Sequence, residues 1–90
     1  MKHRHDDFQF RVIEYLGMVP GVSWKDVSQV DGFVDLIVGW KGINHLWEIK
    51  SEKGKLSKEQ KLFHHCWSGK IVVIRSIEDI NNALGIPNQK

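Results

Sequence analysis

Hydrophobic and polar positions recur along this chain with two different periods, and the periods predict its helices and strands. Apolar residues at helical spacing predict a first helix that is capped by Asp6 or Asp7 and ends at Gly17. The next segment, residues 22–27, alternates apolar and polar side chains, as a first strand does. The apolar stripe of the first helix consists of Phe8, Val12, Tyr15 and Leu16.

Two further apolar runs, residues 32–38 and 43–50, predict a β-hairpin. The glycine of Lys41-Gly42 between them can take the positive φ that a tight hairpin turn requires. If these two residues form the turn, Trp40 pairs with Ile43. The whole register of the hairpin follows from that one pair, because directly opposed residues are then found by counting outward.

A second helix is predicted after a polar loop. Ser57 as N-cap and Gln60 three residues later fit a capping box, in which each side chain satisfies a backbone amide of the other. Ser68-Gly69 ends this helix. The residues expected on one apolar face are Leu62, Phe63, Cys66 and Trp67.

The rest of the chain predicts a buried strand and a short last helix. Residues 71–74 form a continuous apolar run, Ser76 can cap the helix that follows, and Gly85 ends it. A strand that follows a crossover helix usually returns parallel to a neighbouring strand. The order α-β-β-β-α-β-α therefore predicts an α/β fold, with a small mixed sheet flanked by helices.

Composition adds little to the predicted fold class. Ninety residues predict a single domain over 1–90, and 41% apolar residues with four tryptophans indicate a folded globule. A chain this short has a small core, so a partner subunit would add stability. The chain begins without an apolar segment and contains no run near the ~20 residues that span a bilayer, so we expect an intracellular protein without membrane contact.

The single cysteine, Cys66, excludes an intramolecular disulfide, and its place in the helical pattern predicts a core thiol. The sequence His64-His65-Cys66 resembles a zinc-binding tract. However, three consecutive helical residues do not face one point, which argues against a zinc site.

The hairpin register places two acidic residues opposite each other. Asp35 and Glu48 are separated by twelve residues, and pairing of the strands puts them side by side. Like charges repel there unless a cation lies between them. Lys50 projects from the same face as Glu48, so the set could hold Mg²⁺ and act on a phosphate ester. A solvated strand face is the alternative interpretation of the same pattern.

Lysines are concentrated directly after this pair. A local basic surface has the right sign for a phosphate backbone, although a solubilising loop has the same composition. The residues concerned are Lys53, Lys55, Lys58 and Lys61.

These motifs together resemble those of the virus-type replication-repair nuclease (VRR-NUC) family, within the PD-(D/E)xK nuclease superfamily. The similarity extends over nearly the whole chain. It is carried by Asp7-Phe8-Gln9 through Tyr15-Leu16, Gly32-Phe33-Val34-Asp35-Leu36-Ile37, Trp47-Glu48-Ile49-Lys50, Gly54-Lys55-Leu56-Ser57 with Gln60, and Ile74-Arg75-Ser76-Ile77-Glu78-Asp79. Val34 departs from the family pattern, which usually has proline before the aspartate.

The resemblance implies a restriction-endonuclease-like αβββαβ core and hydrolysis of DNA phosphodiesters with Mg²⁺ or Mn²⁺, leaving a 5′-phosphate. It implies that Asp35 and Glu48 are catalytic metal ligands and that Lys50 is the catalytic lysine. It also implies an active-site role for Gln60. Asp7 stands where the family has a glutamate, and would contact the metal directly or through water, or only cap the first helix.

The expected function is that of a structure-selective DNA endonuclease. Two symmetric sites of a homodimer suit paired cuts at a four-way junction, and stand-alone members of the family are similar to junction resolvases. Two alternatives stay open. One is a nuclease for flaps or single strands, and the other is a non-catalytic nucleic-acid-binding module of the same fold.

Overall fold

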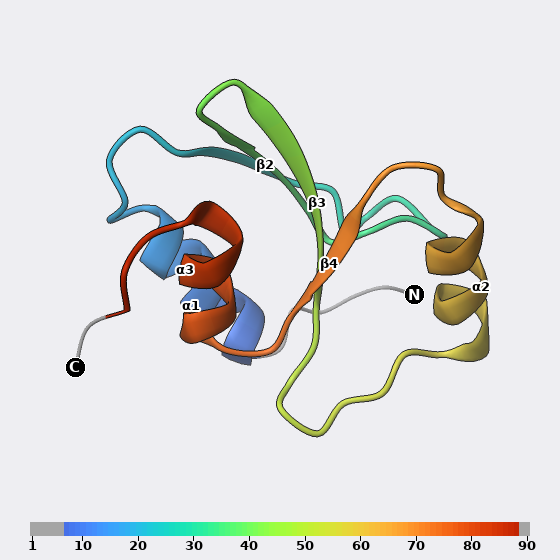
Figure 1. Ribbon diagram of the computed structural model, residues 1–90. Helices are drawn as coiled ribbons and strands as arrows, with labels where there is room; N and C mark the ends of the chain where they lie inside the picture. The colour runs from blue at the N-terminus through green and yellow to red at the C-terminus, as the bar shows by residue number, and fades with distance from the viewer. Residues whose placement is uncertain (1–6, 89–90) are drawn as a thin grey trace.

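The protein is described by a computed structural model that covers residues 7–88, and these residues form three helices and one four-stranded sheet (Figure 1). Their order is the predicted one, so the small mixed α/β fold is confirmed. The elements are α1 (Asp7–Leu16), β1 (Ser23–Asp26), β2 (Leu36–Trp40), β3 (Ile43–Ile49), α2 (Lys58–Cys66), β4 (Ile71–Ile74) and α3 (Ile77–Leu84).

The sheet has the strand order β1-β2-β3-β4. Strands β1, β2 and β3 are antiparallel, and β4 lies parallel to β3. The parallel strand follows α2, as expected for a crossover helix. The hairpin turn is also as predicted: Trp40 pairs with Ile43, and Lys41 and Gly42 have φ values of 52° and 83°.

The first arm of the hairpin differs from its prediction. The apolar run begins at Gly32, but β2 begins only at Leu36, where it pairs with Trp47. The backbone amide of Ile49, further along β3, is bound instead by the side chain of Asp35. The strands therefore separate at this end of the hairpin, and residues 33–35 are not part of a strand.

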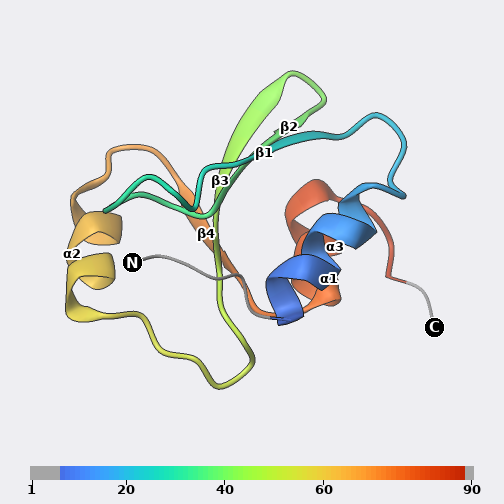
Figure 2. The same cartoon turned by 180° about the vertical axis from the view of Figure 1, so that it is seen from behind.

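The core lies on one face of the sheet, between the sheet and the two helices α1 and α3 (Figures 1 and 2). The hydroxyl of Tyr15 in α1 donates to the side chain of Asn81 in α3 at 2.6 Å, which ties the two helices together. The buried core residues are Val12, Leu16, Leu36, Val38, Trp47, Ile49, Ile74, Ile80 and Leu84.

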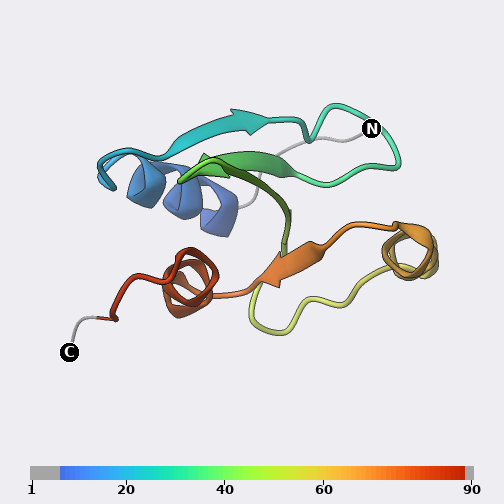
Figure 3. The same cartoon turned by 45° about the horizontal axis from the view of Figure 1, so that its top comes forward.

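Helix α2 lies apart from these helices, at the other side of the sheet (Figure 3). The predicted capping box is present, with both the Ser57 and the Gln60 side chains bonded to each other's backbone amides. None of the helix's residues is fully buried. It is anchored by an aromatic cluster in which the rings of Phe63 and Trp67 lie 6.0 and 6.1 Å from that of Phe33.

The prediction that Cys66 is a core thiol is wrong. Cys66 is exposed, and Leu62, one helical turn earlier, is 64% exposed. Contacts with Phe33 and Glu48 determine which side of α2 faces the sheet. The helix residues that make these contacts are Gln60, Phe63, His64 and Trp67.

Helix α3 begins and ends where the sequence predicts. Ser76 caps α3 by accepting the backbone amide of Asp79, and Gly85 ends the helix with a φ of 74°. Strand β4 is less buried than predicted. Only Ile74 is fully buried, because β4 is the last strand of the sheet and has one neighbour. No helix within residues 7–88 has the length and apolar character needed to cross a membrane.

Candidate active site between strand β3 and helix α2

Asp35 is held where strands β2 and β3 separate. Its carboxylate Oδ2 accepts the backbone amide of Ile49 at 2.8 Å, and its own amide donates to the carbonyl of Trp47 at 3.1 Å. On its other side, the Asp35 carbonyl accepts the amide of Val27 at 2.8 Å. The backbone of Asp35 is therefore held from both sides, and its carboxylate is bonded to the end of β3.

Glu48 is almost completely buried, with 2% of its surface exposed. Its side chain meets helix α2: Nε2 of Gln60 donates to Oε2 at 3.2 Å, and Nε2 of His64 lies 3.3 Å from Oε1. Burying a carboxylate is costly unless polar partners replace water. The structure supplies such partners on both oxygens of Glu48.

A cavity of about 200 Å³ lies between these groups. It brings together Asp35, Glu48 and Gln60, three of the residues predicted from the sequence. Phe63 contributes an apolar wall. The remaining lining residues are Gly32, Phe33, Ser57 and Glu59.

Lys50 lies one residue past the end of β3 and is half-buried. Its backbone amide donates to the carbonyl of Ile74 at 3.0 Å. Lys50 does not line the cavity. The Lys50 charge nevertheless affects the site electrostatically. The pKa of His64 is lowered first by burial and then by the Lys50 ammonium.

Asp7, the other predicted metal ligand, is not brought to this cavity. It is the exposed first residue of α1, and α1 packs on the opposite face of the sheet from α2 (Figure 2). Asp6, the alternative cap of that helix, lies outside the described residues. Asp35 and Glu48 are thus the two predicted ligands that share a cavity.

Two carboxylates could ligate a Mg²⁺ ion but do not make an all-protein metal cage. Within residues 7–88 no group of three or more His, Cys, Asp or Glu side chains is arranged to hold a metal. Mg²⁺ keeps several waters and is usually bound through one or two carboxylates together with substrate phosphates. Asp35 and Glu48, which line the cavity, would hold such an ion and leave its remaining positions to water and substrate.

The predicted basic surface is exposed along the approach to α2. The lysines lie in the loop that joins β3 to α2 and on the first half of that helix (Figure 1). All four are accessible to a ligand: Lys53, Lys55, Lys58 and Lys61.

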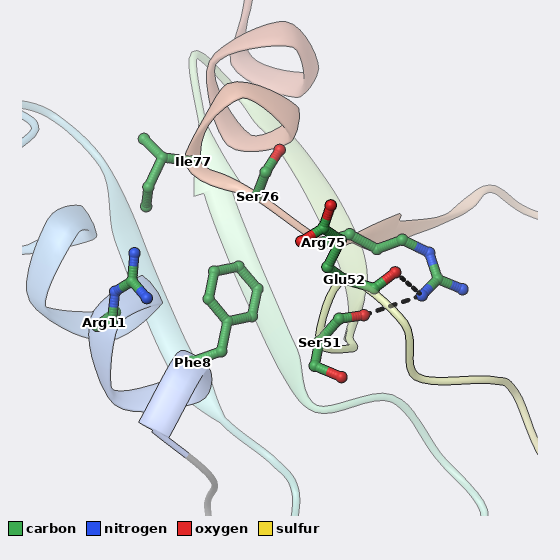
Figure 4. Close-up of a pocket in the computed structure, with 7 residues that line it drawn as sticks. All are labelled: Phe8, Arg11, Ser51, Glu52, Arg75, Ser76 and Ile77. Atoms are coloured by element: carbon green, nitrogen blue, oxygen red, sulfur yellow. Dashed lines mark hydrogen bonds between the residues drawn. The ribbon is translucent and has the colours of Figure 1, made fainter.

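That loop is held in place by Arg75, which lies between β4 and α3. Nη1 of Arg75 donates to the backbone carbonyl of Ser51 at 3.0 Å and lies 3.5 Å from that of Glu52 (Figure 4). It also donates to the backbone carbonyl of Gly54 at 2.5 Å. Arg75 lines a second cavity of about 670 Å³, together with Phe8 and Arg11 of α1. None of the predicted active-site residues lines this larger cavity.

Three residues at or near the site were not predicted from the sequence. Glu59 follows a lysine in the capping box and gave no sign of facing the cavity. Arg75 acts on a loop that is distant in sequence. His64 could have been found, since it stands four residues after Gln60 and so shares its helix face.

Comparison of the chain with protein-family models, with curated proteins and with solved structures finds no match. The fold and the cavity therefore stand on the structure itself. The resemblance to the VRR-NUC family rests on the motifs of the sequence, and the activity that it implies is a proposal.

Proposed function

We propose that this protein is a metal-dependent, structure-selective DNA endonuclease with a restriction-endonuclease-like core. The observation that carries the proposal is the meeting of Asp35 and Glu48 in one cavity, each carboxylate fixed by a different element. Two carboxylates that line one cavity attract a divalent cation, because an opposite charge between them offsets their mutual repulsion. The exposed lysines beside the cavity favour a polyanionic substrate.

The reaction is hydrolysis of a phosphodiester. The oxygen of water forms a bond to phosphorus, the bond from phosphorus to the 3′ oxygen breaks, and that oxygen takes a proton. The products are a 5′-phosphate and a 3′-hydroxyl. Mg²⁺ or Mn²⁺ held by Asp35 and Glu48 would supply a Lewis acid next to the scissile phosphate.

The remaining residues act around those carboxylates. Lys50 orients the attacking water or stabilises negative charge that develops on the phosphate. Gln60 holds Glu48 through Oε2 and closes the cavity from the helix side. Lys53, Lys55, Lys58 and Lys61 bind the DNA backbone, since contacts between lysines and phosphates position a duplex without reading its sequence.

The test is a cleavage assay on linear, flapped and four-way-junction DNA, with Mg²⁺, with Mn²⁺ and with EDTA. The wild type is expected to cut with either metal and not with EDTA, and Glu48→Gln is expected to be inactive. Glu59→Gln is a matched control, because Glu59 lines the same cavity but is exposed. A wild type that binds these DNAs without cutting any of them would refute the nuclease.

We further propose that the protein is a homodimer that prefers four-way junctions. Apolar surface remains uncovered around α2, where Leu62 is 64% exposed and Trp67 is 41% exposed. The sheet face beneath α2 also carries half-buried apolar residues, Ile37, Leu46, Ile71 and Val73. Pairing two chains by a twofold axis would cover such surface and present two identical sites to one branched substrate.

Light scattering and junction cleavage test this second part separately. We expect a mass twice the 10.5 kDa of one chain, and paired cuts in opposing strands of the junction. Leu62→Lys is expected to give a monomer that cuts junctions poorly. A monomeric wild type that cuts flaps or single strands and spares junctions would refute the resolvase and leave the nuclease standing.

A non-catalytic nucleic-acid-binding module is the alternative. It is favoured by one observation: the exposed lysines beside the cavity can bind a polyanion without a metal. DNA binding that is independent of divalent metal and unaffected by Glu48→Gln would support it.

A further inference from the structure

Both oxygens of Glu48 are met by residues one helical turn apart on α2. Nε2 of Gln60 lies 3.2 Å from Oε2, and Nε2 of His64 lies 3.3 Å from Oε1. Residues at i and i+4 share one face of a helix, so a single helix supplies both contacts. An ionised Glu48 carboxylate only accepts hydrogen bonds, so in that state Nε2 of His64 is the donor of this contact.

The position of this helix face is set at its first turn. Oε1 of Gln60 accepts the backbone amide of Ser57 at 2.9 Å, which completes the capping box. With that oxygen occupied, the amide nitrogen of the same side chain is directed at Glu48. The capping box that starts α2 therefore also orients the Gln60 amide toward Glu48.

The His64 ring packs against its neighbour in the helix, Phe63. Its edge meets the ring of Phe63 with centroids 6.2 Å apart, and Phe63 in turn packs against Phe33. Only 15% of the His64 side chain is exposed. The imidazole is therefore fixed by packing before any ligand enters the cavity.

We propose that His64 is a positioning residue for Glu48, and that its Nε2–H bond to Oε1 orients this carboxylate for a divalent cation. Each carboxylate oxygen has about two lone-pair sites, so one bond to His64 and one to Gln60 occupy only part of the acceptor capacity of Glu48. Partners of this kind typically change metal affinity by about 10- to 100-fold when removed. The effect on cleavage rests on the proposed nuclease function, whereas the effect on metal affinity does not.

The experiment measures Mn²⁺ affinity by calorimetry and cleavage as a function of metal and DNA concentration. His64→Phe keeps a ring and loses the donor. We expect Mn²⁺ affinity to fall by about 10-fold or more, and the metal concentration for half-maximal cleavage to rise equally, with KM for DNA unchanged. His64→Gln, which can again present an N–H group, is expected to recover most of the loss.

His65→Phe is the matched control, since His65 is its exposed neighbour in the same helix. It is expected to match the wild type in every measurement. His64→Asn, which is polar but too short to reach Oε1, is measured in parallel. If His64→Phe does not fold, the Mn²⁺ affinity of His64→Asn tests the proposal in its place.

The possible outcomes separate the two proposals. Wild-type Mn²⁺ affinity in His64→Asn, or a loss in His64→Gln as large as that in His64→Phe, would overturn the positioning role. A wild type that binds no Mn²⁺ would overturn it as well. Mn²⁺ binding that depends on His64 in a protein that cuts no DNA would uphold the role and refute the nuclease.

Discussion

The carboxylate of Asp35 accepts the backbone amide of Ile49 at 2.8 Å, at the point where strands β2 and β3 stop pairing. The Asp35 side chain here replaces the next backbone hydrogen bond between the two strands. The strands can part without leaving the Ile49 amide unbonded, and both Asp35 and Glu48 line the cavity at this point. The same carboxylate thus stabilises the fold and lines the candidate site.

This double role predicts that Asp35→Asn separates metal binding from stability. The Asn oxygen can still accept the Ile49 amide, but the charge that attracts a cation is gone. We expect Mn²⁺ affinity to fall by at least about 10-fold and the unfolding free energy to change by no more than about 0.5 kcal/mol. Calorimetry and urea unfolding measure the two quantities.

Two further variants complete that test. Asp35→Ala removes the acceptor as well and should cost about 1–3 kcal/mol, because the Ile49 amide is then left unbonded. Asp31→Asn, at an exposed position of the preceding turn, should change neither quantity. Unchanged Mn²⁺ affinity in Asp35→Asn would remove Asp35 from the metal site.

Lys50 is predicted to act in the chemical step more than in DNA binding. Lys50→Ala should lower the single-turnover cleavage rate by about 10²–10³-fold, the usual effect of losing one group that stabilises developing charge. DNA affinity, measured by fluorescence anisotropy, should stay close to the wild type because the exposed lysines remain. Lys53→Ala is the control and should affect mainly affinity. Equal losses of rate and affinity in Lys50→Ala would instead make Lys50 a substrate-binding residue.

Arg75 is predicted to stabilise the loop between β3 and α2. Arg75→Ala removes a cationic donor from the carbonyls of Ser51 and Gly54, and should lower the unfolding free energy by about 1.5–3 kcal/mol. Trypsin should then cut faster at Lys53 and Lys55, which lie in and beside the released turn. Arg11→Ala is the control, because Arg11 lines the same cavity from α1. Equal proteolysis of the two variants would show that the loop does not depend on Arg75.

His45 is predicted to make stability fall at acid pH. Burial, and then the charge of Lys70, lower the pKa of His45 in the folded protein. The unfolded chain therefore binds more protons below the ordinary histidine pKa of about 6.5, and stability decreases from there down to the folded pKa. The stabilising contribution is fully present above about pH 6.5.

A comparison of His45→Gln with the wild type isolates that effect from other titrating groups. His45→Gln should lose less unfolding free energy than the wild type between about pH 7.5 and about pH 5. Identical pH dependence in the wild type and in His45→Gln would exclude a contribution from His45.

Local signals predicted most of the elements and one register. The glycine turn at Lys41-Gly42 determined which residues oppose each other, because a two-residue turn leaves a single pairing for Trp40 and Ile43. The capping box of Ser57 and Gln60 located the start of α2 to the residue. Both signals depend on residues within a few positions of one another, which is why they can be read without knowing the fold.

The sequence by itself determined the order of elements and the parallel return of β4, since these follow from periodicity, turn chemistry and the geometry of a crossover. The predicted strand pair of Asp35 with Glu48 is not formed, because β2 begins at Leu36, but both residues line one cavity. Only the tertiary structure decided which side of α2 faces the sheet. The helix carries two apolar stripes that overlap, and the contacts of Phe63 with Phe33 and of His64 with Glu48 select one of them. That choice exposes Cys66 and brings His64 to the site, because a helix of given periodicity is oriented by what it packs against and not by its own pattern.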